Sequence, residues 1–149
     1  MKNRAVIITG DRNAKAEVWR PVVSQAIIDI HEGEGKRVLI HGGASGIDTI
    51  ANLAWSFGYG PDSIRVHEAE WDACYRTYSN RNMAGPLRND LMLTELLFLK
   101  RMGWQVGVVA FHDALYKGSR GTRNMIHIAQ AARVRTIAFK SDGSTYGSQ

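Results

Sequence analysis

The sequence has 149 residues, 44% of them hydrophobic, and a formal net charge of +5. This length suits one well-formed hydrophobic core, so we expect a single domain over residues 1–140 and a flexible, small and polar tail over residues 141–149. The basic residues form no Lys/Arg run, which argues against a nucleic-acid surface and favours a small anionic ligand.

The cysteine count and the lack of a long apolar stretch exclude further kinds of protein and site. Cys74 is alone, so an internal disulfide and a cysteine-based zinc site are excluded. No stretch approaches the roughly 20 apolar residues of a membrane-spanning helix, so we expect a cytoplasmic protein with no membrane partner.

Short apolar runs alternate with longer helix-like stretches along the chain. The runs, expected to be strands, are residues 5–9, 37–41, 64–68, 106–111 and 134–139. Apolar residues recur at helical spacing over 17–34, and Gly33 and Gly35 are expected to end that helix. Ser45 is the expected N-cap of a second helix that ends near residues 58–60, and two more helices are predicted at 87–102 and 122–132. This order predicts an α/β protein with a Rossmann-like, open, mainly parallel five-stranded sheet and helices on both faces.

Residues 72–86 interrupt this alternation with polar and aromatic residues of no clear period. We predict a long loop between the third strand and the third helix, and a candidate lid, because long loops in compact domains are commonly functional.

Glycine-containing turns follow three of the predicted strands, at residues 9–12, 41–48 and 118–122. In an open parallel sheet the ligand lies beyond the carboxyl ends of the strands, and a helix that starts there presents free N–H groups to an anion. Two of these turns also carry hydroxyl groups, at Ser45 and Thr122, with arginines nearby, and we predict a phosphate site. The spacing matches neither G-x-G-x-x-G nor G-x-x-x-x-G-K-[ST], so an ordinary dinucleotide dehydrogenase and a P-loop ATPase are disfavoured.

The titratable residues leave alternatives open. The histidines lack metal-ligand spacing, and we expect no metal and no cofactor. Asp48 is a candidate for holding ribose hydroxyls or acting as a base, or else it satisfies backbone amides at a helix start. Glu68 and Glu70 flank the end of the third strand, and the adjacent Trp71 either stacks on a base or closes the core.

Four segments together resemble a known family. Residues 6–12, 40–48, 84–89 and 118–125 resemble, in order, the YspA-type branch of the SLOG superfamily, which includes proteins related to DprA and to the LOG phosphoribohydrolases. The resemblance covers nearly the whole chain, and its most specific part is the G-P-x-R-N element followed by a G-x-x-G-T loop. It implies a Rossmann-like domain that binds a nucleotide-derived ligand, acts in nucleotide signalling or phage–host conflict, and forms homo-oligomers.

LOG enzymes cleave the bond between a base and ribose 5′-monophosphate with an arginine that corresponds to Arg88 and a glutamate a few residues after the glycine-threonine loop. That second position corresponds to Met125, which cannot exchange protons. The leading hypothesis is therefore a binding protein, a sensor or a sequestering protein, in which Arg88 and Asn89 clamp the phosphate. The alternative is an N-glycosidic hydrolase with Arg88 and Asp48 as catalytic residues, or with Glu68 or Glu70 in the place of Asp48. Binding of single-stranded DNA, as in DprA, would need a continuous basic groove and is disfavoured.

These arguments give one set of predicted ligand-binding residues. They are Thr9, Gly10, Arg12, Gly42, Gly43, Ala44, Ser45, Gly46, Asp48, Glu70, Trp71, Arg88, Asn89, Gly118, Ser119, Arg120, Gly121 and Thr122.

Overall fold

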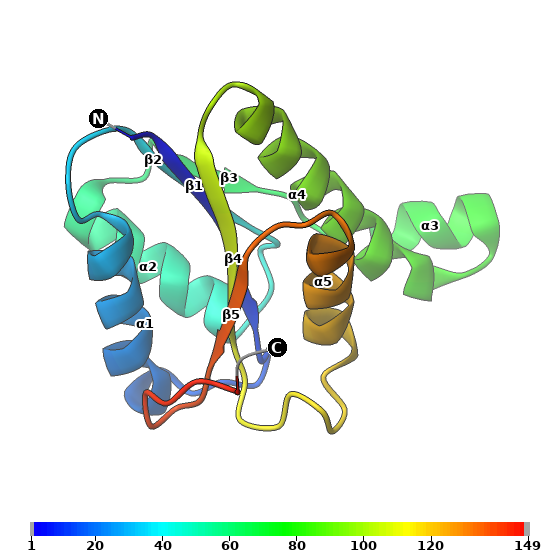
Figure 1. Ribbon diagram of the computed structural model, residues 1–149. Coiled ribbons are helices and arrows are strands. Elements are labelled where there is room, and N and C mark those ends of the chain that lie inside the picture. The colour runs from blue at the N-terminus through cyan, green and yellow to red at the C-terminus, as the bar shows by residue number, and fades with distance from the viewer. Residues whose placement is uncertain (1, 148–149) are drawn as a thin grey trace.

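The computed structural model describes residues 2–147, which form an α/β fold around one parallel sheet (Figure 1). Its five strands lie in the order β3-β2-β1-β4-β5. They are β1 (Arg4–Gly10), β2 (Arg37–His41), β3 (Ile64–Val66), β4 (Gln105–Phe111) and β5 (Thr136–Phe139). The predicted fold class is confirmed.

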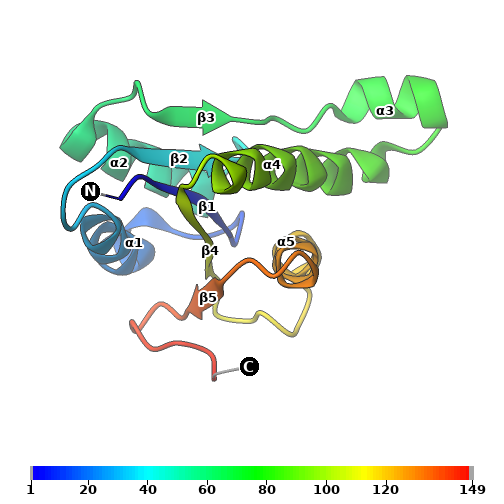
Figure 2. The same ribbon diagram turned by 45° about the horizontal axis from the view of Figure 1, so that its top comes forward.

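The helices cover both faces of the sheet. Helices α1 (Ala16–Ile30) and α2 (Ile47–Tyr59) lie on one face, and α4 (Ala84–Arg101) and α5 (Arg120–Ala131) on the other (Figures 1 and 2). Alternate residues of β1 point to opposite faces, so Val6 and Ile8 pack with the first pair of helices while Ala5 and Ile7 pack with the second. Each face thus has its own apolar core, as a buried parallel sheet requires.

The predicted long loop at residues 72–86 is wrong, because the segment is helical. It contains α3 (Trp71–Tyr78), the short 3-10 helix η1 (Arg81–Met83) and the first turn of α4. Helix α3 projects beyond the end of the sheet (Figure 2), and its residue Cys74 is buried. The helix has only eight residues, which is shorter than the window of about 11–18 residues in which helical periodicity is recognised in a sequence.

The predicted N-cap of α2 is also wrong. The cap residue is Gly46, with φ of 75°, and the Ser45 hydroxyl instead donates to the main-chain oxygen of Arg12 at 2.9 Å. A Cβ at Gly46 would lie 2.2 Å from the carbonyl oxygen of Asp11. Contact between the loop after β1 and the loop after β2 therefore requires glycine at this position.

A buried arginine holds the chain together at the amino ends of the strands. Arg37 is 7% exposed, and its guanidinium donates to the carbonyl oxygens of Lys2, Ile30, Glu32, Glu34 and Lys36 at 2.6–3.3 Å. These bonds tie the end of α1 and the turn after it to the start of β1. Burial lowers the pKa of Arg37, and the nearby charge of Arg4 lowers it further.

The sequence predicts a flexible tail over residues 141–149, of which residues 148 and 149 lie outside the described part of the chain. Up to Gly147 the chain turns back onto β5, where the Tyr146 amide donates to the Ala138 oxygen at 3.0 Å. The Tyr146 hydroxyl donates to the His112 oxygen and accepts from the Leu115 amide at 3.1 Å. The tail thereby contacts the loop between β4 and α5.

Candidate functional site

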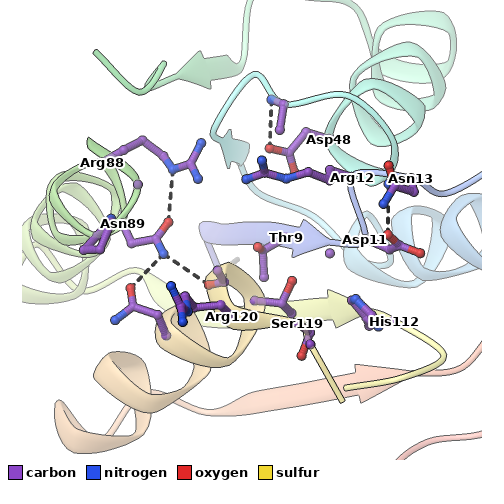
Figure 3. A pocket seen from close by; sticks show the side chains of 18 of the residues that line it. Thr9, Asp11, Arg12, Asn13, Asp48, Arg88, Asn89, His112, Ser119 and Arg120 are labelled. Atoms are coloured by element: carbon purple, nitrogen blue, oxygen red, sulfur yellow. Dashed lines mark hydrogen bonds between the residues drawn. The ribbon is translucent and has the colours of Figure 1, made fainter. Parts of the chain in front are cut away.

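A pocket of about 710 Å³ opens at the carboxyl ends of β1 and β4 (Figure 3). The chain runs outward from β1 through β2 to β3, then returns to β4 on the other side of β1, so strand order reverses between β1 and β4. Ligands of open α/β sheets bind at this kind of switch point. The pocket volume lies within the range of about 300–1,000 Å³ that is usual for small-molecule sites.

Most predicted site residues line this main pocket. They are Thr9, Gly10, Arg12, Ala44, Asp48, Trp71, Arg88, Asn89, Gly118, Ser119, Arg120, Gly121 and Thr122. Gly42, Gly43 and Ser45 line an adjoining hollow of about 360 Å³, called the side hollow below. Gly46 and Glu70 line neither cavity, since Gly46 packs against the loop after β1 and Glu70 directly precedes α3.

The turn after β1 is built by close backbone packing. A Cβ at Gly10 would lie 2.3 Å from the Phe111 carbonyl oxygen, so a side chain there would push β1 from β4. The Asp11 amide donates to that same oxygen at 3.0 Å, and the Asp11 oxygen accepts from the Ile47 amide at 3.0 Å. This turn fixes the start of α2 against the sheet and leaves the exposed Arg12 side chain at the pocket mouth.

The glycine loop after β2 uses several of its amides inside the protein. The amides of Gly42 and Ala44 each donate to Asp48 Oδ2 at 3.2 Å, and the Gly43 amide donates to His41 Nδ1 at 3.0 Å. These three N–H groups are therefore not available to a phosphate. The expectation that the whole loop cradles phosphate does not agree with this geometry, because the Asp48 carboxylate already takes the anion's place.

Asp48 is 7% exposed, and opposing effects act on the pKa of its carboxyl group. Burial raises the pKa of this carboxyl group, while the hydrogen bond from Ala44 and the charges of His41 and Arg88 act in the opposite direction. Its second oxygen, Oδ1, has no hydrogen-bond partner among the residues the structure describes, and Asp48 lines the main pocket. The structure thus bears out the amide-satisfying role and leaves one acceptor free for a ligand hydroxyl.

Arg88 reaches into the pocket from α4 toward Arg12 (Figure 3). Its Nε donates to Asn89 Oδ1 and its Nη1 to the Gly42 oxygen, both at 3.1 Å, so three of its five N–H groups remain for a ligand. A Cβ at Gly42 would lie 2.4 Å from Arg88 Nη1, which shows why this position is glycine. Burial lowers the pKa of Arg88, Asp48 raises it, and Arg12 lowers it.

Asn89 is a tether and has no free group for a phosphate. Its Nδ2 donates to the Gly121 oxygen at 3.2 Å and to Asn124 Oδ1 at 2.9 Å, while its Oδ1 accepts from Arg88. The side chain is 2% exposed. Asn89 therefore orients Arg88 and holds the start of α5 beside it.

The start of α5 presents unpaired backbone donors. The first helical bond runs from the Arg123 amide to the Ser119 oxygen at 2.9 Å, so the amides of Arg120, Gly121 and Thr122 have no acceptor within the helix. The Ser119 hydroxyl donates to the Leu115 oxygen and fixes the loop before the helix. A Cβ at Gly121 would meet no atom within 4 Å. These donors and the helix dipole favour an anion at this place.

Several lining residues were missed by the sequence prediction. They are Asp11, Asn13, Asn82, Gly85, Pro86, Met92, His112, Lys117 and Asn124. His112 follows β4 directly, so its place at a strand end is a signal that could have found it. Its Nδ1 accepts from the Ala114 amide at 2.9 Å, so in the neutral ring Nε2 carries the proton and can donate.

Met125 and Glu68, two further residues considered in the sequence analysis, lie in different environments. Met125 is 0% exposed in the core with Met92 and lines neither cavity. Glu68 lines the side hollow. In the part of the chain that the structure describes, no group of three or more His, Cys, Asp or Glu could hold a metal ion, and no helix is long and apolar enough to cross a bilayer.

Comparison with known proteins gives a phage relative. No protein-family model and no solved structure matches the chain. The chain is 34% identical over 143 residues to the Gene 61 protein of Mycobacterium phage D29, an alignment that covers 91% of this chain and 96% of that protein. The chain therefore belongs to the same family as the Gene 61 protein of Mycobacterium phage D29.

Proposed function

We propose that this protein binds a phosphorylated, nucleotide-derived small molecule in the main pocket. The observation that carries the proposal is that two sets of donors lie together in the pocket. The amides of Arg120, Gly121 and Thr122 have no acceptor within α5, and Asn89 connects the start of that helix to the Arg88 guanidinium. Backbone donors at a helix start and a partly free guanidinium are complementary to phosphate oxygens.

The charges around the pocket support an anionic ligand. Its basic side chains are Arg12, Arg88, Lys117 and Arg120, against the acids Asp11 and Asp48. Basic side chains therefore outnumber acidic ones in the lining. Asp48 Oδ1 can accept a hydrogen bond from a ligand hydroxyl, and the His112 ring offers a further polar contact.

Binding without turnover is the better-supported role. The position that carries the catalytic glutamate in LOG enzymes is Met125, which is buried in the core, so this pocket has no acid there. The alternative, hydrolysis of an N-glycosidic bond, is favoured by one observation. Asp48 is a pocket carboxyl whose raised pKa is typical of general acids.

The SLOG resemblance and the phage relative together suggest the setting. A Rossmann-like sheet with its pocket at the switch point agrees with a SLOG-type nucleotide-binding domain. The SLOG resemblance suggests a role in nucleotide signalling or phage–host conflict, and the relative at 34% identity is a phage protein. We also propose a homo-oligomer, because Leu91, Phe98 and Met102 of α4 and its C-cap are 58–64% exposed.

Calorimetric titration of the wild type with AMP and other nucleoside monophosphates tests the proposal. Loss of a charge-assisted hydrogen bond costs about 1.5–3 kcal/mol, so Arg88→Ala should weaken AMP binding roughly ten- to a hundredfold. Arg101→Ala, an exposed arginine at the end of α4 outside both cavities, is the matched control and should not change affinity.

Chromatography of the same mixtures separates binding from hydrolysis. AMP returned intact supports a binding protein. Release of free adenine by the wild type at about one turnover per second or more would establish the hydrolase instead. Equal affinity of wild type and Arg88→Ala for AMP would refute the phosphate site.

A further inference from the structure

The main pocket and the side hollow adjoin one another. Four residues line both cavities and form a waist between them: Arg12, Ala44, Trp71 and Arg88. The side hollow has its own volume of about 360 Å³, which is itself within the range of small-molecule sites. A ligand in the main pocket can therefore extend past the waist.

The waist brings two cations together, and the charge of the nearby Asp48 acts on Arg88 as well. Arg12 lowers the pKa of Arg88, the effect of a nearby like charge, and in Figure 3 the two guanidinium groups lie toward one another. The Arg12 side chain has no hydrogen bond or ion pair within the described residues. An anionic group between the two arginines would relieve their repulsion and take up their free N–H groups.

The side hollow has a different chemistry from the main pocket. Gly42 and Gly43 form part of its wall. Gly43, whose φ is 68°, has no side chain, so the space beside Glu68 stays open. The Glu68 carboxylate has no hydrogen bond or ion pair among the described residues. A carboxylate accepts hydrogen bonds from hydroxyl groups or attracts a cationic ring, and it repels a further phosphate.

From this arrangement we propose that the ligand has two ribose-bearing arms joined by a pyrophosphate. One arm lies in the main pocket, the bridging phosphates extend from the start of α5 to the waist, and the second arm lies in the side hollow with its hydroxyl groups or a cationic base at Glu68. This inference rests on the proposed function and names the class of compound that the same site takes.

The test compares AMP with NAD, in which a pyrophosphate joins a second ribose with a cationic ring. We expect NAD to bind at least tenfold more tightly than AMP. Ala69→Phe fills the side hollow, since Ala69 lines that cavity and not the main pocket, and should abolish the advantage of NAD while AMP affinity is kept. Glu68→Gln should reduce the advantage without changing AMP binding. Ala131→Phe, an exposed position outside both cavities, controls for the added ring.

The outcomes separate this inference from the proposed function. If AMP binds in an Arg88-dependent manner but NAD binds no more tightly, or if Ala69→Phe weakens AMP and NAD equally, the two-armed ligand is refuted and the phosphate site stands. If neither AMP nor NAD binds the wild type, both proposals fail. An NAD advantage that Ala69→Phe abolishes, that Glu68→Gln reduces and that Ala131→Phe leaves unchanged supports the two-armed ligand.

Discussion

Replacement of Asp48 by asparagine and by alanine tests its structural role as an acceptor of backbone hydrogen bonds. The carboxylate accepts the amides of Gly42 and Ala44 through a single oxygen, and an asparagine oxygen in the same place can accept both. Alanine leaves two N–H groups without a partner. Hydrogen bonds to a charged acceptor contribute about 1.5–3 kcal/mol each, and removal of a poorly solvated carboxylate offsets part of this loss. We expect Asp48→Ala to lose about 2–3 kcal/mol and Asp48→Asn less than about 1 kcal/mol.

Urea unfolding followed by circular dichroism across pH 4–8 measures both effects. Because burial raises the folded pKa of Asp48 above its unfolded value of about 3.9, the folded state holds the proton more tightly. Wild-type stability should therefore fall as pH rises from the unfolded pKa to the folded one, and Asp48→Asn should lack this contribution. The reasoning is refuted if Asp48→Asn and Asp48→Ala lose equal stability, or if the pH dependence of Asp48→Asn equals that of the wild type.

Three further substitutions test other parts of the site. Gly121→Val places its side chain in open space, so the unfolding midpoint should change little while AMP binding, measured by calorimetry, is lost; retained affinity would contradict the assigned loop. Met125→Glu should cost about 4 kcal/mol at pH 7, the cost of keeping a core glutamate neutral, and should release no adenine. Its urea midpoint should recover at lower pH, and a pH-independent midpoint would show that the side chain reaches solvent. Tyr146→Phe leaves the Leu115 amide unpaired and should speed hydrogen exchange over residues 115–119 by about tenfold; unchanged exchange would show that the tail does not hold this loop.

The sheet and the position of the pocket could be predicted because their signals are local. Short apolar runs such as residues 37–41 and 106–111 mark buried parallel strands, and the glycine turns after them mark the strand ends. The roles of single side chains could not be predicted, because they depend on contacts between distant segments. Asn89 is read from sequence as a ligand contact, yet its partners Gly121 and Asn124 are more than 30 residues away.

A contact between distant segments also explains the error at Ser45, whereas the error in the glycine loop concerns contacts between residues that are close in sequence. Ser45 has the residue type of a helix cap, but its hydroxyl donates to the main-chain oxygen of Arg12, and the cap residue of α2 is Gly46. The amides of Gly42 and Ala44 look free in sequence, and only folding brings the Asp48 carboxylate to them. Helix α3 was missed for a different reason, since its eight residues are fewer than the window of about 11–18 residues in which helical periodicity is recognised.

The hydrogen bonds of Arg37 stabilise the fold at a place that lies away from the pocket. Its bonds go to main-chain carbonyls, which every residue type provides, so the identities of the neighbouring side chains matter little to them. They lie at the amino edge of the sheet, opposite the edge that holds the pocket. Substitutions around the pocket therefore leave this anchor intact, and the fold can tolerate changes in ligand specificity. Members of this family can accordingly diverge in the residues that line the pocket while they keep one scaffold.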